Sequence, residues 1–110
     1  MVKQERGALG GTTTMLVLAL LKEQEMYGYQ IIEELERRSN DVFKLKEGTL
    51  YPILHGLEKD KLVTAREAEA PNGRMRRYYR ITAQGLKALE EKKEEWRVSS
   101  AAVTAILAGA

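Results

Sequence analysis

The chain has 110 residues, of which 44% are hydrophobic and 31% charged, the balance typical of one globular domain. It contains no cysteine and one histidine, which excludes disulfides, thiolate metal sites and most histidine-based metal centres. No nucleophile or paired acid and base accompanies that histidine, so the sequence favours neither an enzyme nor a metal or cofactor site. The apolar run Met15–Leu21 is too short to cross a membrane, so we expect a cytoplasmic protein with no membrane partner.

The formal net charge is only +2, but the charges are unevenly distributed along the chain. Residues 37–80 hold eleven Lys and Arg against six Asp and Glu, whereas the other residues hold seven against ten. A solvated surface mixes its signs more evenly than this. The basic region therefore suggests a polyanionic partner.

Hydrophobic periodicity predicts three helices in the first half of the chain. Residues 1–11 contain three glycines and no periodicity, so we expect a flexible arm there. A first helix, 12–22, is apolar almost all round, whereas helices at about 27–38 and 47–60 each have one apolar face. The polar stretch 39–41 separates the last two. Two short helices joined by a tight connection, behind a supporting helix, indicate a helix-turn-helix.

The stretch "LVTAREAEAPNGRMRRYYRIT" (62–82) predicts a β-hairpin. Pro71 suits the first position of a turn, and Asn72-Gly73 accepts positive φ. Alternation along the second arm places Tyr79 on one face and Arg76 on the opposite face. A helix-turn-helix followed by a basic hairpin is the winged-helix arrangement, in which the second helix enters the major groove of DNA.

The last segment predicts a long helix that Thr82 caps and that runs towards residue 107. Seven positions follow a heptad rhythm, and five of them are apolar. One small core cannot cover such a helix, so we predict a homodimer. The predicted interface residues are Leu86, Leu89, Trp96, Val103 and Leu107.

The predicted fold is mainly α, of the α+β class. It combines a winged helix-turn-helix domain over residues 12–81, with a two-stranded β wing, and a C-terminal dimerisation helix over residues 82–110.

The predicted helix at 47–60 carries an unusual set of residues on the face turned away from the core. Thr, Tyr and His side chains can each meet hydrogen-bonding groups or methyl groups on base edges. Gly48 lets the helix start approach a phosphate closely, and Pro52 costs little near a first turn. An equally open interpretation is that Tyr51 and His55 only cover neighbouring side chains. The predicted DNA-binding residues of this helix are Gly48, Thr49, Tyr51, Pro52 and His55.

The hairpin arginines are clustered, with only two glutamates opposite them. Phosphate contact is therefore a better interpretation than a solvated strand face. The predicted contacts on the wing and its flanks are Arg74, Arg76, Arg77, Lys46 and Tyr27.

The segments "MYGYQIIEELERRS", "EGTLYPILHGLEKDKLV" and "GRMRRYYRITAQGLKALE", with the tryptophan of the last helix, resemble the short form of the PadR family of bacterial transcriptional regulators. The resemblance covers about residues 11–107. It implies a homodimeric winged-helix repressor that binds an inverted repeat in double-stranded DNA and often releases it on binding a small molecule. His55-Gly56 stands where relatives commonly carry basic residues, so the operator sequence stays open.

The same resemblance makes Trp96 a candidate effector-binding residue, because some short-form relatives bind flat aromatic drugs between two such tryptophans. Paired indoles would sandwich a planar aromatic cation or phenol. The simpler interpretation is that Trp96 fills the dimer core. Two other functions also stay open: a DNA-binding regulator without an effector, and a winged-helix module that binds proteins.

Overall fold

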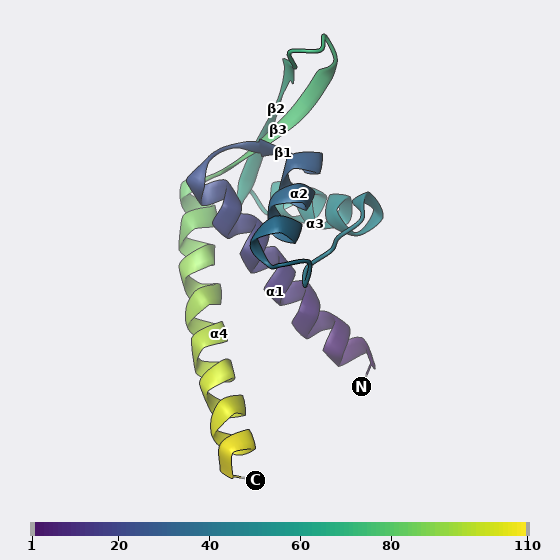
Figure 1. Ribbon diagram of the computed structural model, residues 1–110. Coiled ribbons are helices and arrows are strands. Elements are labelled where there is room, and N and C mark those ends of the chain that lie inside the picture. The colour runs from purple at the N-terminus through teal and green to yellow at the C-terminus, as the bar shows by residue number, and fades with distance from the viewer. Residues whose placement is uncertain (1, 110) are drawn as a thin grey trace.

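The computed structural model describes the backbone from Val2 to Gly109 and the side chains from Gly11 onwards. It confirms the predicted winged-helix fold, with four helices and three strands among the described residues (Figure 1). The elements in chain order are α1 (Val2–Glu23), β1 (Met26–Tyr27), α2 (Gly28–Arg38), α3 (Glu47–Lys59), β2 (Val63–Glu69), β3 (Met75–Ile81) and α4 (Ala83–Gly109).

Helix α1 begins at Val2, ten residues before the start predicted at Thr12. The glycines of the first eleven residues lower helix propensity, but no proline interrupts the helix. The predicted flexibility of residues 1–11 stays a prediction, since the side chains of residues 1–10 lie outside the described part of the chain.

The hydrophobic core forms around α1. Val17 and Leu18 are fully buried, as are Ile31 of α2 and Leu54 of α3. The elements that pack on α1 are α2, β3 and α4. Three elements of the same chain cover α1, which explains why this helix is apolar on more than one side. None of the helices, over the residues described, combines the length and the apolarity needed to cross a membrane.

The strands form one antiparallel sheet in the order β1-β3-β2. The hairpin β2–β3 is the predicted wing, and Gly73 adopts a φ of +85° in its turn, as the Asn-Gly signal predicts. The sequence did not predict β1, which pairs Met26 with Tyr79 and Tyr27 with Tyr78. A strand of two residues is too short to show an alternating pattern. Through this pairing, the start of α2 is fixed to the base of the wing.

The start of α4 is fixed to the end of the α3–β2 connection. The Gly85 N–H donates a hydrogen bond of 3.0 Å to Thr82 Oγ1, so Thr82 caps the helix as predicted. The Thr82 N–H donates to the Leu62 carbonyl at 3.0 Å. Beyond Leu89, which is buried, α4 extends away from the rest of the protomer (Figure 1).

Candidate nucleic-acid interface

The N-terminal half of α3 presents small and polar residues to solvent. The buried face consists of Leu50, Leu54 and Leu57. A Cβ added at Gly48 or Gly56 would meet no atom within 4 Å, so the surface at both positions is open. The carbonyl of Lys46, the N-cap, accepts the first helical N–H groups. The exposed residues of this face are Gly48, Thr49, Pro52, His55 and Gly56.

Pro52 lies in the second turn of α3, not near the first turn as expected. Because proline has no N–H, the carbonyl of Gly48 lacks the donor that a helix normally supplies four residues later. The expectation that Pro52 costs little is therefore wrong. Its position removes one backbone hydrogen bond from the helix, on the exposed face.

Tyr51 is only partly exposed. Its hydroxyl covers Gly28, the first residue of α2: a Cβ added there would lie 2.6 Å from the Tyr51 hydroxyl oxygen. Burial raises the pKa of the phenol, and the charge of Glu47 adds to the effect, so the hydroxyl stays protonated at neutral pH. The structure thus supports the covering role for Tyr51, whereas His55 beside it is exposed, with ring centroids 6.5 Å apart.

The outer face of the wing carries a row of stacked aromatic and guanidinium groups. The Arg76 guanidinium lies 4.1 Å from the centroid of the Tyr27 ring, and the Tyr27 and Tyr78 rings meet edge to face at 5.6 Å. Arg66 lies over Tyr78 at 5.4 Å and forms an ion pair with Glu25. The predicted residues Tyr27 and Arg76 are therefore together, on one face of the sheet.

Arg77 lies on the opposite, inner face of the wing. Its guanidinium donates a hydrogen bond of 2.7 Å to Glu58 of α3, and the carboxylate of Glu67 lies 3.9 Å away. The bond to Glu58 raises the pKa of Arg77. The structure therefore separates Arg77 from Arg76, although the sequence predicted the same phosphate-binding role for both.

The basic region is partly neutralised within the protomer. Four of its arginines form ion pairs with glutamates, and these are Arg37, Arg38, Arg66 and Arg77. The other cations of the region have no carboxylate partner among the described residues: Lys44, Lys46, Lys59, Lys61, Arg74, Arg76 and Arg80. The positive charge available to a polyanion therefore lies before α3, at its C-terminal end and along the wing.

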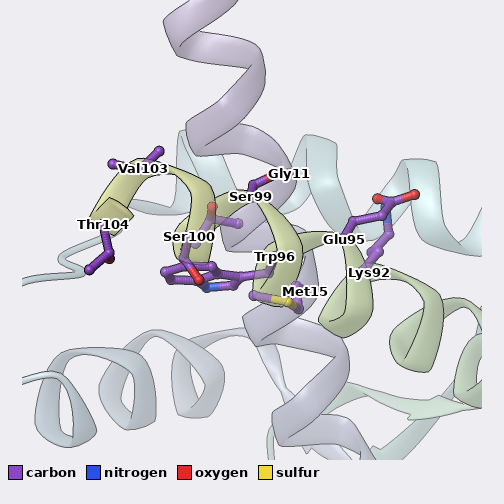
Figure 2. A pocket seen from close by; sticks show the side chains of 10 residues that line it. Gly11, Met15, Lys92, Glu95, Trp96, Ser99, Ser100, Val103 and Thr104 are labelled. Atoms are coloured by element: carbon purple, nitrogen blue, oxygen red, sulfur yellow. The ribbon is translucent and has the colours of Figure 1, made fainter. Parts of the chain in front are cut away.

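A hollow of about 540 Å³ lies between α1 and α4. Figure 2 shows the Trp96 indole lying along α4, with Met15 of α1 beside it. Trp96 is 47% exposed, and Lys92 and Glu95 supply charged groups to the lining. The predicted effector residue thus lies at an open surface hollow of the chain.

The predicted dimer-interface residues divide into two sets. Leu89 is 1% exposed and belongs to the hydrophobic core of the chain, so it does not lie on the free face of α4. Sequence periodicity could not separate these roles, because core and interface both take apolar residues at helical spacing. The other predicted residues are exposed, as are two that the heptad positions did not include: Leu86, Trp96, Val103, Leu107, and in addition Val98 and Ile106.

The arrangement of a helix-turn-helix, an accessible second helix and a basic wing defines a winged-helix DNA-binding protein of the transcription-regulator class. Residues 17–91 match the transcriptional regulator PadR-like family, and the chain belongs to this family.

Solved structures of bacterial regulators are similar to the chain. A transcriptional regulator from Clostridium thermocellum has a TM-score of 0.82 and 31% identity, over 89% of this chain and 95% of that one. A PadR-like transcriptional regulator from Bacillus cereus has a TM-score of 0.74 and 31% identity, over 96% of both chains. A transcriptional regulator of Mycobacterium tuberculosis is 39% identical over 71 residues, or 64% of this chain and 63% of its own length.

Two contributors to the interface were not predicted as functional residues. Arg66 of the wing pairs with Glu25, 41 residues away in sequence, and Glu58 of α3 pairs with Arg77 of the wing, 19 residues away. No local pattern pairs residues at such separations. The only available signal was charge alternation along the strands, which does not identify a partner.

Proposed function

We propose that the chain is a homodimeric, sequence-specific repressor whose binding to an inverted repeat in double-stranded DNA is relieved by a small-molecule effector. Membership of the PadR-like family implies transcriptional regulation and DNA binding. The observation that supports sequence-specific DNA binding is that the chain combines an exposed face on α3 with wing cations that have no carboxylate partner among the described residues. A regulator of bacterial genes acts on DNA in the cytoplasm, which is where we place this protein.

In the proposed complex, the exposed face of α3 lies in the major groove. Thr49 and His55 offer polar groups to base edges, and Gly48 allows the start of the helix to approach a phosphate. Lys46, immediately before the helix, adds a positive charge. Tyr51 contributes less to base contact, because its hydroxyl covers Gly28.

The wing contacts the DNA backbone through Arg74 and Arg76. Arg74 is exposed near the tip, and its N–H donates to Asn72 Oδ1 at 3.0 Å, which holds the turn. Arg76 is held by its contact with the Tyr27 ring and has no carboxylate partner among the described residues. A cation placed in advance in this way gives up less side-chain entropy when it meets a phosphate.

The exposed apolar residues of α4 support a dimer. Val98 and Val103 are each 54% exposed, and Ile106 and Leu107 are more than 70% exposed. An apolar strip of this kind at the end of a long helix is typical of an interface. Two copies related by a two-fold axis would place two α3 helices on the two halves of an inverted repeat.

The hollow beside Trp96 supports the effector. Its lining combines an indole and Met15 with the charges of Lys92 and Glu95, a combination that suits a planar aromatic molecule. A second copy of the chain would turn this open hollow into an enclosed site.

Fluorescence anisotropy tests the proposal directly. The protein is titrated onto the duplex upstream of its own gene and onto a scrambled duplex, each at two salt concentrations. We expect tight binding to the native duplex alone, and Arg76→Ala is expected to lower the slope of log affinity against log salt by about one unit. Arg97→Ala, which removes a charge from the far part of α4, is the matched control and should leave the slope unchanged. Equal and weak binding to both duplexes would contradict the proposal.

The dimer and the effector have separate tests. The double variant Trp96→Ala, Val103→Asp is expected to sediment as a monomer, and a persistent dimer would refute the α4 interface. Because Trp96 is the only tryptophan, its fluorescence reports on the hollow. Proflavine, a planar aromatic cation, should quench it in a saturable manner, whereas a linear response would contradict a site.

A further inference from the structure

Glu58 and Arg77 join α3 to the wing. Glu58 lies in the last turn of α3, and Arg77 lies on the inner face of β3, two residues before the fully buried Tyr79. Their side chains meet at 2.7 Å. Among the described residues, this is the only hydrogen bond between side chains of α3 and of the wing strands.

The surroundings of Arg77 hold it on the protein. Glu67 lies opposite Arg77 in the strand register, with its carboxylate 3.9 Å from the guanidinium, and the Tyr79 ring centroid lies 5.8 Å from it. To reach a phosphate, Arg77 would have to leave a charge-assisted bond and expose the Glu58 carboxylate close to the DNA. Arg76, on the outer face, meets no such competition.

The wing needs a connection of this kind because its outer half is a two-stranded ribbon. Strand β1 pairs with β3 only at Tyr78 and Tyr79, so Met75–Arg77 pair with β2 alone. Two-stranded ribbons are only marginally stable in water and twist strongly. Arg77 lies in this ribbon, beside the point where the third strand ends, which is where a single link to α3 has most effect on the angle of the ribbon.

We propose that the Glu58–Arg77 pair fixes the angle between α3 and the wing, so that the wing reaches the DNA backbone when α3 lies in the groove. Arg77 is then a positioning residue, not a phosphate contact, and Glu58 strengthens operator binding although it is acidic. The effect on operator binding rests on the proposed DNA-binding function. The orientation of the wing is a property of the free protein and can be measured without DNA.

The variant Glu58→Gln gives results of opposite sign for the two roles of Arg77. If Arg77 contacts phosphate, removing a nearby negative charge and releasing the guanidinium should tighten binding. If the pair positions the wing, Glu58→Gln should weaken operator binding about fivefold, the upper range for a partly exposed ion pair, and leave the affinity for scrambled DNA within about twofold, the selective loss expected when orientation is disturbed. The matched control is Glu69→Gln, which removes an exposed wing carboxylate that has no hydrogen-bond partner among the described side chains and should tighten binding slightly.

A double-mutant cycle that combines Glu58→Gln with Arg77→Gln distinguishes a positioning role of Arg77 from the simple loss of its charge. Positioning predicts that the double variant binds the operator no more weakly than either single variant, because one bond is lost in all three. It also predicts that Glu58→Gln and Arg77→Gln change the salt slope equally, because both weaken the same wing contacts. A slope lower by about one unit for Arg77→Gln than for Glu58→Gln would identify Arg77 as a phosphate contact and overturn the proposal. Exposed ion pairs contribute little to folding, so all of these variants should fold.

A measurement without DNA keeps this inference distinct from the proposed function. Residual dipolar couplings of the N–H groups of α3 and of the wing should fit one fixed orientation in the wild type. They should require a different or averaged orientation in Glu58→Gln. Unchanged couplings would refute the positioning role. Failure of the wild type to prefer its operator would refute the proposed function while leaving the orientation test valid.

Discussion

Gly85→Ala should destabilise the protein, although alanine is normally the better helix former. Gly85 lies in the first turn of α4 and is buried. A Cβ added there would lie 2.1 Å from the Leu62 carbonyl oxygen and 2.6 Å from Ile81 Cγ1, far inside the ordinary contact range of 3.4–4 Å. The carbonyl cannot easily move, because it accepts a hydrogen bond of 3.0 Å from the Thr82 N–H and shares the Thr82 hydroxyl, also 3.0 Å away, with the Lys61 carbonyl.

The size of the effect follows from three contributions. Overpacking costs about 1–3 kcal/mol, and displacing the carbonyl weakens hydrogen bonds worth about 1 kcal/mol each. The helix propensity of alanine returns about 1 kcal/mol. The free energy of unfolding should therefore fall by about 2–4 kcal/mol, which lowers the melting temperature by about 10 °C or more in a chain of this size.

Gly56→Ala is the matched control, because it makes the same chemical change inside α3 where the added methyl group meets nothing within 4 Å. It should raise stability by about 1 kcal/mol. Thermal unfolding followed by circular dichroism at one fixed protein concentration measures both variants, since association shifts the midpoint. A Gly85→Ala protein that melts at or above the wild-type temperature would refute the assigned packing of α4.

Two further predictions concern packing in α2 and α4. Gly28→Ala should lower stability by about 2 kcal/mol, because the methyl group would lie 2.6 Å from the Tyr51 hydroxyl, and Tyr51→Phe in the same chain should recover part of the loss. Urea unfolding of the two single variants and the double variant measures this coupling, and strictly additive effects would contradict it. Leu89→Ala should cost about 3 kcal/mol in stability, whereas Leu107→Ala should chiefly weaken association. Sedimentation at several concentrations separates the two effects, and equal weakening of association by both would contradict the assignment of Leu89 to the protomer core.

Local signals predicted the fold well because each one had a distinct physical cause. Pro71-Asn72-Gly73 specified the hairpin turn, and Thr82 specified the start of the last helix. Strand β1 was missed because two residues form a strand only where a partner is already present. Its partner lies more than fifty residues later in the chain.

The site was less predictable because the interactions that decide it connect distant segments. Alternation distinguishes the two faces of β3, but it does not show that Glu58 lies within reach of Arg77. In the same way, the Tyr51 side chain is polar enough to read bases, and only the packing of α2 on α3 shows that its hydroxyl covers Gly28. Residue type specified which groups could bind DNA, and tertiary contacts specified which of them remain available.

The pairing of β1 with only the base of the wing makes the length of the hairpin adjustable without disturbing the fold. Its base is held by three strands, while the part from Met75 to Arg77 and the turn beyond it touch only β2 within the sheet. Adding two residues to each arm would move the tip outward by about 7 Å, roughly the rise of two base pairs, and would keep every side chain on its own face. Adding one residue would exchange the faces and turn Arg76 inward. Hairpins of this architecture can therefore change their reach along DNA only in steps of two residues.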